Sequence, residues 1–457
     1  MYKILGSLLI SCSLTYASLV GSNYNQRDLL VLKELDIDTA YITDYKLQKT
    51  YSRFLTKSQS KYVEKLNDAS LFVPKIKAIL REEGMPSSFL YLAMAESYLN
   101  LSARSAVSAA GVWQFMPRTG RSFGLQNDLY VDERLDLVKS TYAASKYLKR
   151  LHGMFGKWYL AALAYNCGEG RVIEAITRAT IDMYVEDNGK NHNRKQIRKF
   201  RKTIKDYQKK RVRFSALYKV YKEVIKWDYK PDVNELLKVQ KGLRRQYLPK
   251  ESREYIRKII SLGFMNNREF ITSADNSHLL NIGSTGSIAT IYVKGGMHLK
   301  NVAQVVGIDY KELTNLNRHI KRYIVPPEAD TYPIYIPYSR LTRFNANKGS
   351  LKKASYAMHI VKKGDSLGVI GRKYKVSYKL IKKYNKLKSN FLSINQKLII
   401  PVSLEDLPPK PAVYLVKRGD TLDSISKKYK INLKQLMKDN NKKTSLIRIG
   451  DKIVINY

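Results

Sequence analysis

Glu96 is the residue whose type and position most clearly suggest chemistry, because its carboxyl group follows the apolar residues 89–95, Phe-Leu-Tyr-Leu-Ala-Met-Ala. A helix that is apolar on every side is buried. Desolvation and the partial negative charge at the carboxyl end of a helix both raise the pKa of a carboxyl group placed there. A carboxyl group that stays protonated near neutral pH can act as a general acid. The alternative, from this feature alone, is a helix-end glutamate that points into water.

Two further segments offer groups that could meet a ligand. Residues 101–111 are rich in Ala, Ser and Gly, so a bulky ligand can approach the backbone, and residues 112–117, Val-Trp-Gln-Phe-Met-Pro, place an amide beside aromatic rings. Residues 158–166 form a second apolar run that ends in polar groups. Two buried helices that each end in polar residues can present them to one cleft.

Helices are expected to position all of these groups. Residues 72–83 are amphipathic and stop at Gly84, a residue that commonly ends helices, and Pro86 suits the first turn of the next helix. The helical pattern continues to residue 176. The sequence therefore predicts an all-α domain here.

Three motifs in this domain resemble those of soluble-lytic-transglycosylase domains, which have a goose-type, lysozyme-like core. They are Ala-Glu-Ser at 95–97, Ala-Gly-Val-Trp-Gln-Phe-Met-Pro at 110–117 and Ala-Tyr-Asn-Cys-Gly-Glu-Gly-Arg-Val at 164–172. Residues 131–136 resemble the segment between the second and third motifs. In that family a glutamate protonates the glycosidic oxygen between N-acetylmuramic acid and N-acetylglucosamine, then accepts the proton of the muramoyl 6-hydroxyl as it attacks the anomeric carbon.

The resemblance implies roles for six residues and needs neither metal nor cofactor. Glu96 would be the acid/base. Ser105, Gln114 and Met116 would line the saccharide site, Tyr165 would lie near the developing oxocarbenium ion, and Asn166 would contact sugar. Cys167 stands where many relatives have a small residue such as alanine.

A hydrolase would need a second carboxylate across the cleft. The candidates are Asp132, Glu133, Asp136 and Glu169. We expect residues 132–136 to be the start of a helix instead.

Two copies of one pattern end the chain at an offset of 55 residues, with Val-Lys-Lys-Gly-Asp-Ser-Leu at 361–367 and Val-Lys-Arg-Gly-Asp-Thr-Leu at 416–422. Each predicts a β-α-α-β unit. A degenerate third copy begins at Val293 but lacks the Gly-Asp pair. The units resemble LysM modules, which bind glycans containing N-acetylglucosamine. Groove residues by this resemblance are Asp365, Ser366, Asp420 and Thr421. Whether the degenerate copy binds glycan stays open.

The amino terminus reads as a secretory signal cleaved after Ala17. Lipid attachment at Cys12, with outer-membrane association, is the less favoured alternative because its leader would be short. Once Cys12 is removed, Cys167 is the single cysteine, so an intramolecular disulfide is excluded. Export places the protein in the periplasm.

The formal net charge of +43 implies attraction to a polyanion. That polyanion could be nucleic acid, the headgroups of anionic lipids or a wall polymer rich in carboxylates. Export argues against nucleic acid. The densest basic run, residues 190–226, has the alternative interpretation of a solvated helical face.

The whole chain is similar to membrane-bound lytic murein transglycosylases of type D. Seven segments are expected: a signal peptide (1–17), an amino-terminal helical segment (18–70), a catalytic domain (71–185), a basic helical segment (186–285), a degenerate LysM-like module (290–338) and two LysM modules (356–402 and 412–457). The expected partner is the glycan strands of peptidoglycan. A water-using muramidase and a non-catalytic wall-binding scaffold remain as alternatives.

Overall fold

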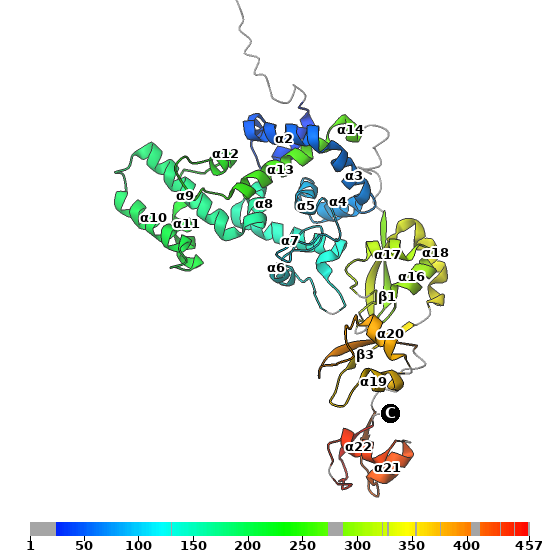
Figure 1. The fold of residues 1–457 in the computed structure, drawn as a ribbon. Helices are drawn as coiled ribbons and strands as arrows, with labels where there is room; N and C mark the ends of the chain where they lie inside the picture. The colour runs from blue at the N-terminus through cyan, green and yellow to red at the C-terminus, as the bar shows by residue number, and fades with distance from the viewer. Residues whose placement is uncertain are drawn as a thin grey trace, which may run out of the picture. The chain divides into compact units, whose positions relative to one another are not determined.

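The computed structural model describes residues 24–457, apart from residues 129, 273–286, 322, 327–328, 352–353, 375, 404–411, 430, 443 and 456–457. The predicted signal peptide and Cys12 lie outside the described residues. The chain divides into two compact units (Figure 1). The first comprises Met1–Ala289, Asn317–His319 and Pro337–Ser339, and the second comprises the remainder.

The first unit is helical through the described residues from 24 to 272. Its α-helices are α1 (Gln26–Glu34), α2 (Tyr45–Lys57), α3 (Gln59–Ala69), α4 (Val73–Glu82), α5 (Phe89–Ser97), α6 (Pro117–Ser122), α7 (Leu137–Phe155), α8 (Trp158–Cys167), α9 (Glu169–Asn188), α10 (Arg194–Gln208), α11 (Phe214–Val224), α12 (Val233–Leu237), α13 (Lys250–Asn266) and α14 (Glu269–Thr272). Short 3₁₀ turns, η1 (Thr39–Thr43) and η2 (Glu133–Leu135), lie between them. The prediction of a helical domain followed by small α+β modules is confirmed.

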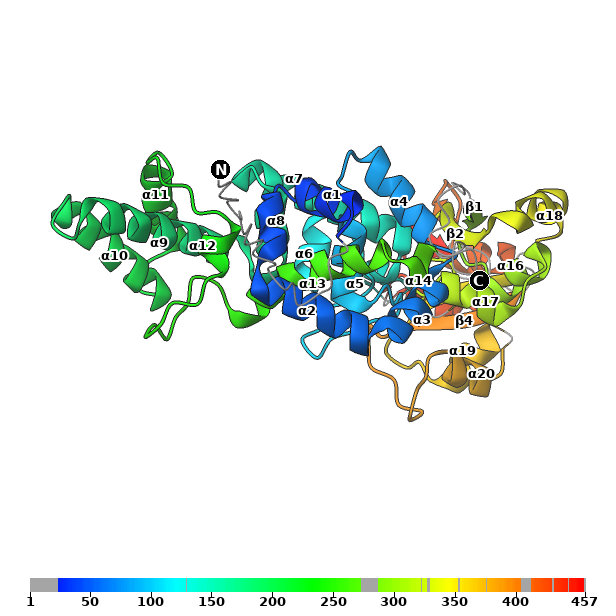
Figure 2. The same ribbon diagram turned by 90° about the horizontal axis from the view of Figure 1, so that it is seen from above.

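The core of this unit is built on α5, α8 and α13. Residues 89–95 of α5 and 159–164 of α8 are buried, as their apolar composition predicted. Helix α13 packs against both, and also against α1 and α2 (Figure 2). Gly263 permits this approach, because a Cβ there would lie 2.9 Å from the Val31 side chain and 3.1 Å from Tyr91.

The turn before α5 follows the predicted pattern. Helix α4 ends at Glu82, and Gly84 adopts φ +60°, a left-handed conformation that glycine takes without steric cost. The amide of Phe89 then donates to the carbonyl of Pro86 at 3.1 Å. This turn sets the start of the helix that carries Glu96.

The basic run 190–226 forms α10 and α11, which pack beside α9. Ile197, Phe200 and Ile204 are the buried residues of α10, at spacings that place them on one face of the helix. Its Lys and Arg side chains are exposed or half-buried. The arrangement agrees with the interpretation of this run as a solvated helical face.

The second unit consists of β-α-α-β modules, each closed by a two-stranded sheet. Their strands pair in the order β1 (Ile288–Lys294) with β2 (Thr331–Pro337), β3 (Ala354–Ile360) with β4 (Lys397–Ser403), and β5 (Ala412–Leu415) with β6 (Lys452–Ile455). The helices between them are α16 (Leu299–Val306) and α17 (Tyr310–Leu316), α19 (Leu367–Lys373) and α20 (Tyr378–Tyr384), and α21 (Leu422–Lys428) and α22 (Leu433–Asp439). After β2 follow η4 (Tyr338–Arg340), α18 (Leu341–Asn347) and η5 (Lys348–Ser350). The segment between β2 and β3 is therefore partly helical.

One asparagine in each carboxy-terminal module ties its second helix to its closing strand. The side-chain amide of Asn385 donates to the Ile399 carbonyl at 2.7 Å and accepts from the Ile399 amide at 2.8 Å. Asn440 makes the same pair with Val454, at 2.9 and 2.7 Å. The repeat of asparagine at an offset of 55 residues thus has a structural cause.

Among the described residues, no helix combines the length and the apolar composition needed to cross a lipid bilayer.

Candidate active site

Glu96 lies in the last turn of α5, two residues before the C-cap Tyr98, whose φ of 52° is left-handed. The hydroxyl of Tyr255 on α13 donates to Glu96 Oε1 at 2.5 Å. Burial raises the pKa of Glu96 to about 7, against the opposing effects of the Tyr255 hydrogen bond and the positive charge of Lys258. Both the protonated and the ionised forms are therefore populated near neutral pH, as a group that acts first as an acid and then as a base requires.

Helix α13 turns three polar side chains towards the end of α5, at the i, i+4 and i+7 spacing that shares one helix face. Besides Tyr255 they are Glu251, whose negative charge raises the pKa of Glu96, and Lys258, whose charge lowers it. The Lys258 ammonium donates to the Ala95 carbonyl at 2.5 Å, which anchors it beside the carboxyl group. One neighbouring helix thus carries groups that raise the pKa of Glu96 and groups that lower it.

Sequence reasoning missed these three residues because α13 lies within the predicted basic helical segment, 186–285. No catalytic motif marks them. The available signal was the burial pattern expected from Tyr255, Ile256, Ile259 and Ile260, which predicts a helix packed against the core rather than a solvated one.

One side-chain hydrogen bond ties the second motif to α5, and another closes a turn within the motif. The Ser97 hydroxyl donates to the Val112 carbonyl at 2.9 Å, and the Gln114 amide Nε2 donates to the Gly111 carbonyl at 2.7 Å. Gly111 has φ +82°, and a Cβ there would lie 1.8 Å from the carbonyl oxygen of Arg134. Only glycine fits this position, which explains the Ala-Gly pair that opens the motif.

Tyr165 joins the end of α8 to the second motif. Its hydroxyl donates to the Trp113 carbonyl at 2.6 Å, and its ring meets Phe115 edge-on with centroids 6.2 Å apart. Burial, followed by the nearby charge of Glu96, raises the pKa of Tyr165 well above its usual value. Tyr165 and Glu96 are therefore within electrostatic reach of one another.

Asn166 also meets α13. The Ser252 hydroxyl donates to Asn166 Oδ1 at 2.7 Å, while the Cys167 thiol points back to the Leu163 carbonyl at 3.2 Å. The structure thus brings α13 into contact with Glu96 at one point and with Asn166 at another.

Ser105 and Met116 are less closely tied to this cluster. The Ser105 hydroxyl accepts from the Ala109 amide at 2.9 Å, and Met116 is 42% exposed where α6 begins. In the described part of the chain, neither side chain makes a hydrogen bond to Glu96.

Comparison with protein families identifies the domains that carry this arrangement. The transglycosylase SLT domain model matches residues 74–184, the LysM-like domain of lytic transglycosylase MltD matches residues 287–353, and the LysM domain matches residues 359–401 and 414–456. The chain has the domain composition of an MltD-type lytic transglycosylase.

Several individual proteins are similar to all or part of this chain. Membrane-bound lytic murein transglycosylase D of Escherichia coli K12 is 26% identical over 399 residues, which cover 82% of this chain and 74% of that protein. Shorter matches include N-acetylmuramoyl-L-alanine amidase sle1 of Staphylococcus epidermidis, 35% identical over 100 residues that cover 21% of this chain and 31% of that protein. The solved structure of the Bacillus cereus spore cortex-lytic enzyme SleL is 29% identical over 22% of each chain with a TM-score of 0.10, which says nothing about the fold.

The four candidate second carboxylates of this chain all have partners elsewhere. Asp132 pairs with Arg134 at 2.9 Å, Glu133 with Lys139 at 2.5 Å, and Glu169 with Arg150 at 2.5 Å. Asp136 caps α7 by accepting from the Lys139 amide at 2.9 Å. Residues 132–136 thus form the 3₁₀ turn η2 and the N-cap of α7, so they lead into a helix as expected. The carboxylate that contributes to the raised pKa of Glu96 is Glu251 instead.

In the LysM modules, the two predicted aspartates hold the turn after the first strand. Asp365 Oδ2 accepts from the Lys362 amide at 2.7 Å and lies 2.8 Å from His359 Nε2. Asp420 Oδ2 accepts from the Lys417 amide at 2.7 Å and from the Tyr414 hydroxyl at 2.8 Å. These bonds give both aspartates a structural role in the turn.

The two predicted hydroxyl residues cap the helix that follows. Ser366 Oγ accepts from the Val369 amide at 3.2 Å, and Thr421 Oγ1 accepts from the Ser424 amide at 3.0 Å. Ser366 and Thr421 are therefore N-caps, as their position after Gly-Asp predicts. Their contact with glycan stays a prediction.

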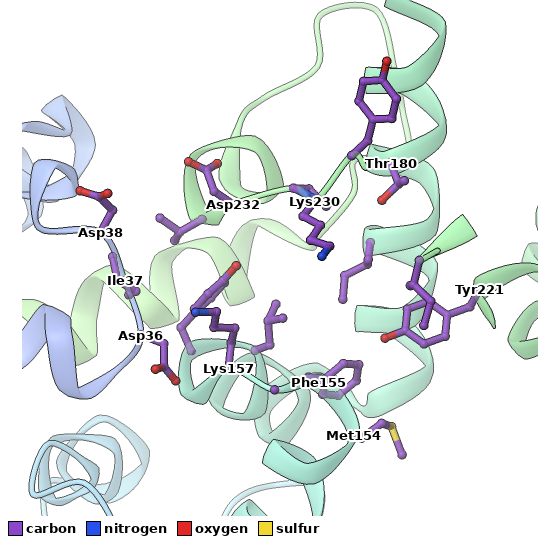
Figure 3. Close-up of a pocket in the computed structure, with 18 residues that line it drawn as sticks. Asp36, Ile37, Asp38, Met154, Phe155, Lys157, Thr180, Tyr221, Lys230 and Asp232 are labelled. Atoms are coloured by element: carbon purple, nitrogen blue, oxygen red, sulfur yellow. The ribbon is translucent and has the colours of Figure 1, made fainter. Parts of the chain in front are cut away.

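A separate cavity of about 690 Å³ lies at the amino-terminal end of α8, opposite the end that carries Tyr165 and Asn166. Figure 3 shows Phe155 and Tyr221 in its wall, with Lys157 and Lys230 among the polar residues. Its lining residues include none of those predicted for catalysis.

Proposed function

We propose that this chain is a peptidoglycan lytic transglycosylase that cleaves the β-1,4 bond between N-acetylmuramic acid and N-acetylglucosamine and leaves a 1,6-anhydromuramoyl end. The observation that carries the proposal is the carboxyl group of Glu96, which has a pKa of about 7 and a hydrogen bond from Tyr255. It stands in an SLT domain with LysM modules behind it. That domain pairing supports peptidoglycan as the substrate.

The hydrogen bond assigns the two oxygens of Glu96 to different tasks. Oε1 accepts the hydrogen bond from the Tyr255 hydroxyl, so the proton of the neutral carboxyl group is carried on Oε2. Oε2 is therefore the oxygen that would donate to the glycosidic oxygen. Proton transfer from Oε2 breaks the bond to the leaving sugar and leaves a carboxylate. The oxygen of the muramoyl 6-hydroxyl then attacks the anomeric carbon while the Glu96 carboxylate takes the proton of that hydroxyl. Glu96 is protonated again at the end, and no water is consumed.

The other predicted residues support this step. Tyr165 would flank the developing oxocarbenium ion with its ring, since its hydroxyl is already bonded to the Trp113 carbonyl. Ser105, Gln114 and Met116 would line the saccharide site, and Asn166 would contact sugar. The LysM modules would hold the polymer, because tethered weak sites raise the local concentration of substrate.

Export to the periplasm remains part of this proposal, with cleavage after Ala17 favoured over lipid attachment at Cys12.

A muramidase is the second candidate, favoured by one observation. Hydrolysis by inversion needs a second carboxylate about 6.5–9.5 Å from the first, and retention needs one at about 5–5.5 Å. Glu251 influences the charge of Glu96 and is exposed, so it is the residue that a hydrolytic mechanism would use. The product distinguishes the two reactions, because hydrolysis leaves a reducing end.

The test is digestion of purified sacculi followed by mass spectrometry of the soluble products. The native protein should release anhydromuropeptides, and Glu96→Gln should release none while still sedimenting with sacculi. Glu186→Gln, which changes an exposed glutamate of α9, is the matched control and should behave as the native protein. Anhydro products from Glu96→Gln, or reducing ends from the native protein, would contradict the proposal.

A further inference from the structure

A basic cavity of about 820 Å³ opens beside the proposed saccharide site. Its lining contains five cationic side chains and no acidic one: Arg171, Arg244, Arg245, Lys250 and Arg253. Its remaining walls are formed by Cys167, Gln208, Gln246, Leu248 and Pro249. Cys167 directly follows Asn166, and Lys250 and Arg253 lie within two residues of Ser252, which donates a hydrogen bond to Asn166. The cavity therefore begins next to the residue proposed to contact sugar.

Part of the positive charge is already neutralised inside the protein. Glu174, which is not among the lining residues, lies 2.7 Å from Arg171 and 2.6 Å from Arg245. In the described part of the chain, Arg244 makes no hydrogen bond or ion pair, and Lys250 approaches an acid only at the 3.9 Å contact with Glu254. Excess positive charge thus remains available to a ligand.

Arg253 is the strongest sign of a binding site. Its side chain is buried, with 9% of the residue exposed, and one nitrogen donates to the Leu248 carbonyl at 2.6 Å. None of the carboxylates that the structure describes forms an ion pair with it. A buried cation without an anionic partner is costly, and an anion bound in the cavity would remove that cost.

The amino terminus of α13 adds to this preference. The helix is 17 residues long, and no side chain caps its first turn, which contributes Lys250 to the cavity wall. Free backbone amides and the helix dipole both favour an anion at such an end.

The glycan itself supplies no such anion. In peptidoglycan the two sugars are neutral once the lactyl carboxyl group of muramic acid is joined to its peptide. The free carboxylates of the polymer lie on those peptide stems, which project from the muramoyl residue. A stem attached to a sugar held at Asn166 would start at the mouth of the basic cavity.

We propose that this cavity binds the carboxylates of the peptide stem, so that the enzyme prefers glycan strands that still carry peptides. The inference rests on the proposed function, since it adds a specificity site to the same reaction. Arg244 and Lys250 would pair with the stem at the rim, and Arg253 would receive a carboxylate in the interior.

The test compares two soluble substrates, uncrosslinked glycan strands with peptide stems and the same strands after the carboxylates of their stems have been converted to neutral amides by carbodiimide coupling with ammonia. The native protein should cleave the strands with free stem carboxylates with a kcat/KM on the order of tenfold higher, as expected for charge-assisted bonds to carboxylates. The double variant Arg244→Gln/Lys250→Gln should bring this ratio close to one. Both side chains are exposed, so folding should be preserved.

The matched control is Lys195→Gln/Lys199→Gln on α10, which removes the same charge from an exposed surface outside the cavity. It should keep the native ratio, and a drop to one would show that general charge rather than the cavity sets the preference. Equal cleavage of both substrates by the native protein would overturn the cavity inference but leave the proposed function intact. Failure to release anhydro ends from either substrate would overturn the proposed function itself.

Discussion

Tyr255 and Glu96 are 159 residues apart in the sequence, yet the Tyr255 hydroxyl donates to Glu96 Oε1 at 2.5 Å. The bond stabilises the ionised carboxylate, and burial opposes it. The pKa of about 7 is the balance of these two effects with the smaller effects of the Lys258 and Glu251 charges. Changes on α13 should therefore alter the pH dependence of catalysis without touching the acid/base itself.

Tyr255→Phe should move the pH profile to higher pH. Without the hydroxyl, the ionised form of Glu96 loses a bond that lowers its pKa. A hydrogen bond to a charged group is worth about 1.5–3 kcal/mol, equivalent to a shift on the order of one pH unit. The rate of anhydromuropeptide release, measured from pH 4 to 9, should show the shift. Tyr142→Phe, which removes the bond to Glu82 on another surface, should leave the profile in place.

Glu251→Gln should shift the same profile in the opposite direction. The negative charge of Glu251 raises the pKa of Glu96, so its removal lowers that pKa. The shift should be smaller than for Tyr255→Phe, because Glu251 is the weakest of the contributions and is exposed to solvent. Products should remain anhydromuropeptides. Loss of all cleavage, with reducing ends from the native protein, would instead identify Glu251 as part of a hydrolytic pair.

Glu96→Gln should stabilise the helical unit at alkaline pH. The pKa of Glu96 rises from 4.5 to about 7 on folding, so the native state binds more protons than the unfolded state between these values. Stability from this group is present below pH 4.5 and is lost as pH rises through 7. Glu96→Gln has no such titration. Its free energy of unfolding should exceed that of the native protein by up to about 3 kcal/mol at pH 8 and differ little from it at pH 4.

Urea unfolding of both proteins at the two pH values measures this difference. Glu186→Gln, again the exposed control, should match the native protein at both. A Glu96→Gln protein that is no more stable at pH 8 would show that the carboxyl group is not buried in the way described.

Gly111→Ala should cost several kcal/mol and abolish activity. The added Cβ would lie 1.8 Å from the Arg134 carbonyl oxygen and the φ of +82° is unfavourable for alanine. Gly124→Ala is a matched control, because Gly124 has φ +85° but nothing within 4 Å of its Cβ position. The control should be destabilised only by the backbone strain of alanine at this φ, roughly 1 kcal/mol. Thermal denaturation of the two variants separates strain from the clash, and equal losses would rule out the clash.

Local features of this protein could be predicted from sequence because they depend on neighbours in the chain. The apolar run before Glu96 predicts a buried helix with a carboxyl group at its end, and Ser366 after Gly-Asp predicts a helix cap. The offset of 55 residues between the two LysM copies predicts a shared fold. Each of these signals is contained within one helix or one repeat.

The environment of Glu96 was decided by packing between distant helices. Glu251, Tyr255 and Lys258 carry no motif, and their segment reads as part of a basic region. Their positions depend on how α13 packs against α5 and α8. The surface shapes of the three helices determine that packing. Gly263 is one such determinant, because the absence of a side chain there lets α13 approach Val31 and Tyr91.

The sequence alone thus determined which carboxyl group could act, which folds surround it and what polymer the modules suggest. The tertiary structure decided which groups set the pKa of that carboxyl group and where a basic cavity opens beside it. The physical reason is range: helix caps, apolar periodicity and repeats act over a few residues of the chain, whereas burial and charge act through space between helices that folding brings together.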